Sequence, residues 1–226
     1  MEQRARQLGD IRCLFLDIGG VLLTNGWDHL ARKRAAANFD IDWPEMELRH
    51  NINVGTLEEG KLSLEEYLAR VIFYQERHFT RGQFREFMFD QSASYPEMIE
   101  LFSKLKANYN LKIFALSNEG RELNAHRIER YRLEGVIDAF VSSCFIHLRK
   151  PDLAMFEVAL DIAQVPAAQI IFVDNTSMFV QIAKSLGMQG IVHTGYQATV
   201  LELGAFGLQM DESFGTDTQL ALYPQS

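Results

Sequence analysis

The sequence predicts an α/β protein with a mainly parallel sheet that is covered by helices on both faces. Its short apolar runs are continuous rather than alternating, which is typical of strands buried on both sides. Segments with helical spacing of apolar residues lie between the later runs. A strand followed by a helix, repeated along the chain, favours parallel strands within one sheet.

Five apolar runs are expected to be strands, and the last of them has the weakest pattern: 11–16, 111–116, 170–173, 190–193 and 137–141. Four segments are expected to be helices: 96–107, 121–133, 152–163 and 177–186. In the first of these helices Met98, Phe102 and Leu105 recur at the spacing of one helix face. The second half of the chain therefore alternates between strand and helix.

The segment 27–91 departs from this alternation because it has several helix starts and no convincing strand. Pro44 stands where the first turn of a helix accepts proline. Ser63 with Glu66, and Thr80 with Gln83, have the spacing of capping boxes. We therefore predict a helical insertion at 27–91, a core domain formed by 1–26 and 92–208, and a weakly patterned tail at 209–226.

The composition excludes several classes of protein. Lys and Arg number 22 against 30 Asp and Glu, and the resulting net charge of −8 disfavours binding to nucleic acid or an anionic membrane. No run approaches the ~18 consecutive apolar residues of a membrane span. The two cysteines, Cys13 and Cys144, are far apart and exclude a disulfide framework. We expect a cytoplasmic protein.

Four motifs with side chains suited to catalysis or ligand binding follow the predicted strands or precede a helix. Asp17 follows the first strand, Ser117 follows the second, Lys150 comes before Pro151, and Asp174 follows the strand at 170–173. In open α/β sheets, the carboxyl ends of the strands form the ligand-binding edge. Two carboxylates, one hydroxyl and one ammonium group at that edge would make a compact site for a cation and a phosphate.

The order and spacing of these motifs resemble the haloacid dehalogenase-like hydrolase superfamily, most of whose members are magnesium-dependent phosphatases. The resemblance covers roughly residues 11–207. It implies a Rossmann-like, doubly wound core with the segment 27–91 acting as a helical cap over the site. It also implies a small phosphorylated metabolite, such as a sugar phosphate, as the substrate.

The resemblance assigns roles residue by residue. Asp17 matches the nucleophile that forms an aspartyl-phosphate, and Lys150 matches the lysine that steadies the nucleophile and the transferring phosphoryl charge. Ser117 and its neighbour Asn118 match the phosphate-holding position. The implied ligands of Mg²⁺ are the Asp17 carboxylate, the Gly19 backbone carbonyl and the Asp174 carboxylate.

Three positions depart from the family pattern. Gly19 stands where most phosphatases of the family carry a general acid and base aspartate, whose help is typically worth ~10² to 10⁴ in rate. From this glycine alone we expect aryl and acyl phosphates to be turned over better than alkyl phosphates. Asn175 replaces an acidic residue beside Asp174, and Phe179 replaces an expected Asp or Asn.

Two other functions stay open from the sequence. One is a catalytically weakened member of the family that binds a phosphometabolite or a protein partner. The other is a dehalogenase or a phosphonate hydrolase, for which Lys33 or Lys61 would be the cap lysine. We expect a monomer or a homodimer in each case.

Two further patterns are interpreted as structural. The segment 55–62 comes close to a nucleotide-binding loop, but Leu62 replaces the required Ser or Thr. Four arginines within 121–133 are interleaved with Glu122 and Glu129, which predicts a solvated helix face rather than a nucleic-acid patch. These arginines are Arg121, Arg127, Arg130 and Arg132.

Overall fold

A computed structural model describes residues 10–209 and contains a five-stranded sheet with the strand order β3-β2-β1-β4-β5. Every neighbouring pair of strands is parallel. The strands are β1 (Cys13–Leu16), β2 (Lys112–Ser117), β3 (Ala139–Ser142), β4 (Ile170–Asp174) and β5 (Gln189–Val192). The parallel α/β sheet predicted from the apolar runs is confirmed, and it includes the weakest strand, β3.

The helices of the described residues follow the predicted order. They are α1 (His29–Asn38), α2 (Trp43–Glu58), α3 (Leu64–Val71), α4 (Arg81–Phe89), α5 (Pro96–Tyr109), α6 (Arg121–Arg130), α7 (Ser143–Ile146), α8 (Leu153–Ala163), α9 (Ser177–Ser185) and α10 (Tyr196–Ala205), with short 3₁₀ turns η1 (Leu133–Gly135) and η2 (Ala167–Gln169). Helices α7 and α10 were not among the predicted elements. Between residues 10 and 209 we find no helix with the length and apolar character that a membrane crossing requires.

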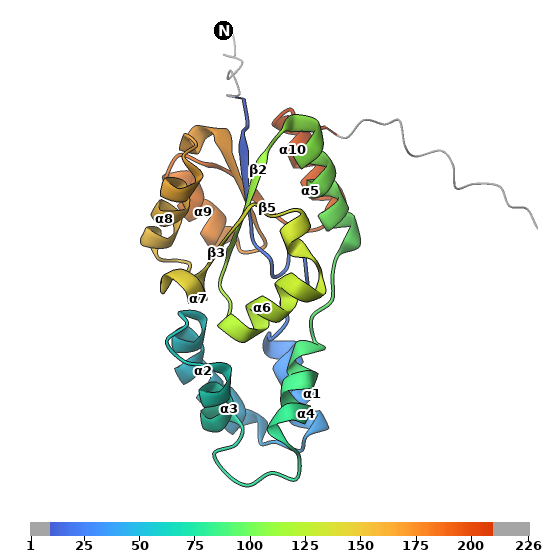
Figure 1. Cartoon of the computed structure of the whole chain (residues 1–226), viewed down its shortest axis with the longest axis vertical. Helices are drawn as coiled ribbons and strands as arrows, with labels where there is room; N and C mark the ends of the chain where they lie inside the picture. The colour runs from blue at the N-terminus through green and yellow to red at the C-terminus, as the bar shows by residue number, and fades with distance from the viewer. Residues whose placement is uncertain (1–9, 210–226) are drawn as a thin grey trace, which may run out of the picture.

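The two faces of the sheet pack against different helices, as Figure 1 shows with α8 and α9 on one side and α5 and α10 on the other. Successive side chains of a strand point to opposite faces. Leu14 and Leu16 of β1 therefore belong to the apolar cluster that contains Phe102 of α5, and Cys13 and Phe15 belong to the cluster under α8 and α9. This explains why the strand sequences are apolar without interruption.

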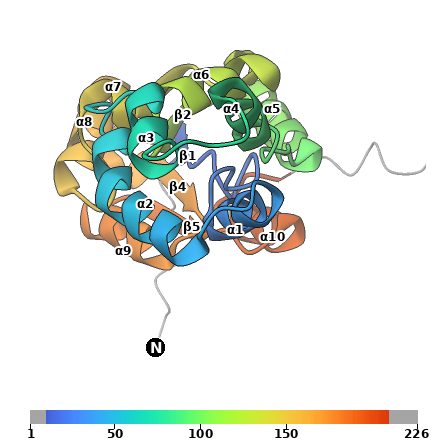
Figure 2. The same cartoon turned by 90° about the horizontal axis from the view of Figure 1, so that it is seen from below.

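Helices α1 to α4 gather beyond the carboxyl edge of the sheet (Figures 1 and 2). They share an apolar cluster of their own, in which Tyr67 and Phe84 are fully buried and to which α6 contributes Leu123. Both predicted capping boxes are present, at Ser63 before α3 and at Thr80 before α4. Pro44 lies in the first turn of α2 as expected.

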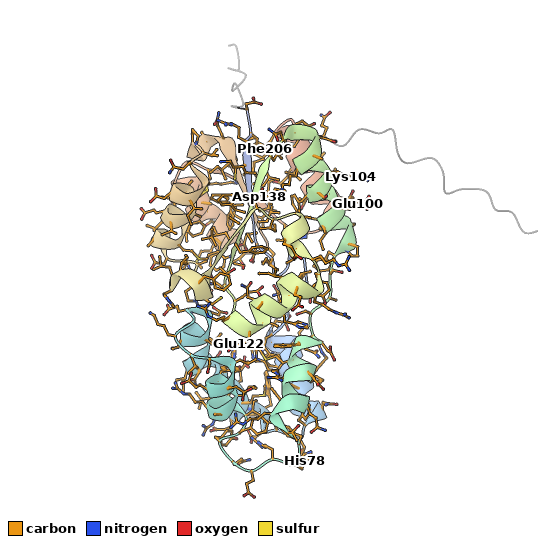
Figure 3. The ribbon with its side chains drawn as sticks, in the orientation of Figure 1. His78, Glu100, Lys104, Glu122, Asp138 and Phe206 are labelled. Carbon is orange, nitrogen blue, oxygen red and sulfur yellow. The ribbon has the colours of Figure 1, made fainter. Side chains whose placement is uncertain are left out.

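The end of α2 and the start of α3 rest directly on the core. Gly60 has a φ of +64°, and a Cβ at this position would lie 2.2 Å from the Cys144 carbonyl oxygen, so the approach requires glycine. Glu122, labelled on α6 in Figure 3, accepts a hydrogen bond from the backbone N–H of Leu64 at 3.1 Å. These contacts hold the inserted helices over the strand ends.

Candidate active site

The sheet brings the four predicted motifs together at its carboxyl edge. β1 lies between β2 and β4, and Leu16 pairs with both Ala115 and Val173. Asp17, Ser117 and Asp174 therefore lie at the carboxyl ends of three adjacent strands and at nearly the same level of the sheet. Lys150 reaches this edge from the turn before α8.

Lys150 joins the two carboxylates of the site. Its Nζ lies 2.6 Å from Asp174 Oδ2 and 3.2 Å from Asp17 Oδ1. Burial alone would lower the pKa of Lys150, but the two carboxylates outweigh burial and raise this pKa above its ordinary value. The ammonium group is therefore charged and is fixed in place.

Asp17 is the member of this trio that faces the open space of the site, and 14% of its side chain is exposed. Its Oδ1 accepts a hydrogen bond from the Ile18 N–H at 2.8 Å. Burial raises the pKa of Asp17, Lys150 opposes this effect, and the charges of Asp174 and Glu119 add to the rise, so that the pKa is about 7. A cation bound beside Asp17 would favour the ionised form, which is the nucleophilic form.

Ser117 and Asn118 have different surroundings. The Ser117 hydroxyl is buried and has no hydrogen-bond partner among the described residues, so it retains its capacity to donate to a ligand oxygen. The Asn118 amide is engaged by the backbone of Lys150, because its Oδ1 accepts from the Lys150 N–H and its Nδ2 donates to the Lys150 carbonyl, both at 2.8 Å. Asn118 thus orients the segment that carries Lys150.

A cavity of about 290 Å³ lies between the sheet edge and the inserted helices. Asp17, Gly19 and Lys150 line it from the core, and Trp27 and Leu57 are part of its apolar wall on the other side. This volume is close to the lower end of the range for small-molecule sites. Asp17 and Lys150 therefore face a space in which a small organic molecule fits.

The three departures from the family pattern occupy definite places. A Cβ at Gly19 would lie 3.3 Å from Asn25 Oδ1 and 4.0 Å from Arg127 Nη1, so neighbouring side chains approach the space of the absent carboxylate. The Phe179 ring lines the cavity, with its centroid 5.1 Å from Lys150 Nζ. Asn175 packs against Gly20, where a Cβ would lie 2.0 Å from Asn175 Nδ2.

The prediction of a solvated arginine face is wrong at Arg127. This side chain is buried, its Nη1 is paired with Glu119, and its Nη2 donates to the Thr24 carbonyl. The other three arginines of the group are exposed as predicted. Arg127 follows buried Leu123 by four residues, so both side chains lie on the inward face of α6. This spacing was the feature of the sequence that could have predicted the burial of Arg127.

Two acidic residues of the site were also missed by sequence reasoning. Glu119 is 5% exposed, lines the cavity, and has one oxygen, Oε2, without a hydrogen-bond partner in the described chain. Glu58, at the end of α2, lines the same cavity and lies 2.6 Å from Arg149 in an ion pair. Glu119 could have been predicted as a site residue because it lies two residues after Ser117. Glu58 has no comparable position in the sequence.

The residues fit a magnesium ion in the chemistry of their donors. Asp17 and Asp174 approach the same ammonium group, so their carboxylates are close together, and with both of them ionised the trio with Lys150 carries a net charge of −1. Within residues 10–209 there is no group of three or more His, Cys, Asp and Glu side chains placed to hold a metal. The donors that the family resemblance implies are the Asp17 and Asp174 carboxylates and the Gly19 carbonyl, an all-oxygen set that would suit Mg²⁺ together with water and substrate oxygens.

The fold and the site define an α/β protein of the hydrolase type with a carboxylate, Asp17, directly after β1. A family model described as haloacid dehalogenase-like hydrolase matches residues 11–187, and the chain belongs to this family. A drimenol cyclase from Aspergillus calidoustus is 26% identical over 195 residues, which cover 80% of this chain and 34% of the cyclase. The chain thus spans about a third of the length of that relative.

Solved structures share the fold at low sequence identity. A HAD family enzyme from Bacteroides thetaiotaomicron superposes with a TM-score of 0.70 at 16% identity, over 85% of this chain and 98% of that one. An L-2-haloacid dehalogenase from Xanthobacter autotrophicus gives a TM-score of 0.58 at 15% identity, over 88% and 85%. These likenesses confirm the Rossmann-like core that the motifs implied.

Proposed function

We propose that this protein is a magnesium-dependent phosphatase of a small phosphorylated metabolite, such as a sugar phosphate. The observation that carries the proposal is the buried Lys150 ammonium group, which lines the cavity together with Asp17 and is paired with both Asp17 and Asp174. A fixed positive charge beside an anionic nucleophile suits attack on an anionic phosphate.

Each residue of the edge has a role in this reaction. Asp17 attacks phosphorus and carries the phosphoryl group, and water then hydrolyses the aspartyl-phosphate. Lys150 holds the nucleophile and neutralises charge on the transferring group. The unpartnered Ser117 hydroxyl donates to a phosphate oxygen. Asp174 orients Lys150 and, with Asp17 and the Gly19 carbonyl, would hold Mg²⁺, which supplies shielding between the carboxylates and the substrate.

A solved neighbour supports magnesium as the cofactor. The Bacteroides enzyme has also been solved in complex with magnesium and inorganic phosphate, with a TM-score of 0.65 at 17% identity, over 82% of this chain and 96% of that one. The all-oxygen donor set of Asp17, Gly19 and Asp174 agrees with the same ion. We extend this cofactor to the present chain as part of the proposal.

We assign specificity to the segment 27–91, acting as a cap over the core formed by 1–26 and 92–208. The cavity walls on the side of the leaving group include the apolar Trp27, Val54 and Leu57. Arg32, the cation that this segment contributes to the cavity, is already engaged by both carboxylate oxygens of Glu47 at 2.8 Å. A leaving group without a second negative charge is therefore favoured.

We further propose that the protein is cytoplasmic and is a monomer or a homodimer. The free thiols of Cys13 and Cys144 are both buried, which agrees with a reducing compartment.

A panel of phosphate esters tests the phosphatase proposal. We expect inorganic phosphate to be released from at least one small ester with Mg²⁺ present, and the release to stop when a chelator is added. Asp17→Asn should abolish the activity. A native protein no more active than Asp17→Asn on every ester would contradict the proposal and favour a binding role. Chelator-insensitive release of halide from a 2-haloacid would instead identify a dehalogenase.

A further inference from the structure

The space beside Gly19 is bordered by Asn25 and, slightly farther away, by the guanidinium group of Arg127. A Cβ at Gly19 would lie 4.0 Å from Arg127 Nη1, the same atom that is paired with Glu119 Oε1. Arg127 is anchored on its other side by the Thr24 carbonyl, so its guanidinium group has a fixed position. Arg127 therefore connects the Glu119 carboxyl group, in the loop after β2, to the position at which most family members carry an aspartate.

Glu119 combines burial with an unused oxygen. Its Oε1 is held by Arg127, whereas its Oε2 is buried and has no partner within residues 10–209. Its backbone N–H donates to Ser143 Oγ at 3.0 Å, which fixes the main chain. Glu119 lines the same cavity as Asp17 and Lys150, and we take this unpaired oxygen as the atom that would contact a molecule there.

The charges around Glu119 favour a carboxyl group that can hold a proton. Burial raises the pKa of Glu119, Arg127 opposes this effect, Glu58 from α2 raises the pKa further, and Lys150 lowers it. The balance leaves the pKa above its ordinary value. Glu119 also raises the pKa of Asp17, which indicates that the two carboxyl groups are close enough to interact.

We propose that Glu119 donates the proton that Gly19 cannot supply. This inference rests on the proposed phosphatase function. Asp17 forms a bond to phosphorus as the bond from phosphorus to the ester oxygen breaks, and the departing oxygen takes the proton of Glu119. The Glu119 carboxylate then takes a proton from the water that attacks the aspartyl-phosphate. Phosphate leaves, Asp17 is regenerated, and Glu119 is protonated for the next turnover.

Two neighbouring acids are less suited to this role. Glu58 lies on the inserted helix α2 and is paired with Arg149 at 2.6 Å. Glu122 uses its Oε1 to accept the Leu64 N–H, and this contact ties it to the docking of α3 (Figure 3). Of these three acids, Glu119 is the one that pairs with Arg127, the side chain that approaches Gly19.

A comparison of leaving groups tests the proposal. A nitrophenolate leaves without protonation, whereas an alkoxide needs a proton. Glu119→Gln should lower kcat/KM for an alkyl phosphate by ~10²-fold or more, and that for p-nitrophenyl phosphate by less than about tenfold. Glu129→Gln, the same change at an exposed position on α6, is the control and should leave both values unchanged. An equal loss on both esters, or no loss, would overturn the role of Glu119.

A rescue separates chemistry from structure. Gly19→Asp, added to Glu119→Gln, places a carboxyl group in the family position, and it should restore alkyl phosphate turnover by at least about tenfold. No rescue, with Mg²⁺ binding retained, would contradict the inference.

The dependence of the rate on the leaving group can also be measured in the native protein, where the folding of a variant is not in question. With Glu119 as the donor, the rate should depend only weakly on the pKa of the leaving alcohol across a series of esters, and the aryl preference expected from Gly19 should appear in Glu119→Gln. A steep dependence in the native chain would overturn the inference alone. A native chain that hydrolyses no ester would overturn the proposed function and this inference with it.

Discussion

Lys150 Nζ lies 2.6 Å from Asp174 Oδ2, and both side chains are buried. The same ammonium group lies 3.2 Å from Asp17 Oδ1. Lys150 therefore links Asp17, which follows β1, to the neighbouring strand β4. A buried charge without its partner is costly, so the pair connects the stability of the core to the chemistry of the site.

Lys150→Met should remove this connection. We expect the free energy of unfolding to fall by about 3–5 kcal/mol, because the buried Asp174 carboxylate and the partly buried Asp17 carboxylate lose their counter-charge. Lys104→Met is the control, since Lys104 pairs with Glu100 on the exposed face of α5 (Figure 3) and should cost only about 0.3–0.5 kcal/mol. Denaturant unfolding of both variants measures the difference. Equal losses would contradict the description of Lys150 as a buried structural charge.

Ser117→Ala should separate binding from stability. The Ser117 hydroxyl has no partner in the described chain, so its removal should leave the free energy of unfolding within about 0.5 kcal/mol of the native value. Inhibition by inorganic phosphate should weaken by about tenfold, because a hydrogen bond to a charged oxygen is lost. Product-inhibition constants and denaturant unfolding check the two halves. A large loss of stability with unchanged phosphate inhibition would assign the hydroxyl a structural role.

Gly60→Ala should disturb the docking of the inserted helices. The new Cβ would meet the Cys144 carbonyl at 2.2 Å, and Gly60 has a φ of +64° that side chains rarely adopt. We expect a loss of about 1–3 kcal/mol in the free energy of unfolding together with a higher KM. Gly135→Ala is the control, because nothing lies within 4 Å of a Cβ there. A native-like KM in a destabilised Gly60→Ala would show that docking does not shape the cavity.

His50 should make stability fall with acid. Its Nδ1 lies 2.8 Å from the Tyr67 hydroxyl, which accepts from Trp27 Nε1 at 3.0 Å, so neutral His50 is the form that fits this chain of hydrogen bonds. Burial, with a further contribution from Arg32, lowers the pKa of His50 from 6.5 to about 4. Between these two values the unfolded chain binds more protons than the folded chain.

The contribution of His50 to stability is therefore complete above pH 6.5 and is lost as the pH falls toward about 4. The loss should reach about 3 kcal/mol. His50→Gln keeps an acceptor for Tyr67 but does not titrate, so the native protein should lose stability relative to this variant over that interval. Denaturant unfolding of both proteins at a series of pH values measures this. Parallel pH profiles would contradict the assignment.

The sequence predicted those parts of the fold that depend on local patterns. The capping boxes at Ser63 and Thr80 involve residues three positions apart, and both were identified correctly. The strands were identified because burial on both faces leaves them continuously apolar. Helix α10 was missed because Thr199 and Leu203 are its only fully buried residues, and this gives a weak apolar spacing.

The sequence predicted the strand-end motifs of the site and missed the side chains that meet there from distant segments. Asp17 and Asp174 were recognisable because each directly follows a buried strand. Arg127 was interpreted as solvated because helix patterning does not reveal a partner such as Glu119, which lies outside the helix. The contribution of Glu58 depends on how the inserted helices dock, which is a tertiary contact.

The proposed phosphatase function requires that Asp17 accepts the phosphoryl group of the substrate. Mass spectrometry of acid-quenched protein during turnover of a phosphate ester tests it most directly. We expect the peptide containing Asp17 to gain the mass of one phosphoryl group, and Asp17→Asn neither to gain it nor to release phosphate. Ester turnover that persists in Asp17→Asn, with no phosphoryl group on that peptide in the native protein, would show that Asp17 does not accept the phosphoryl group.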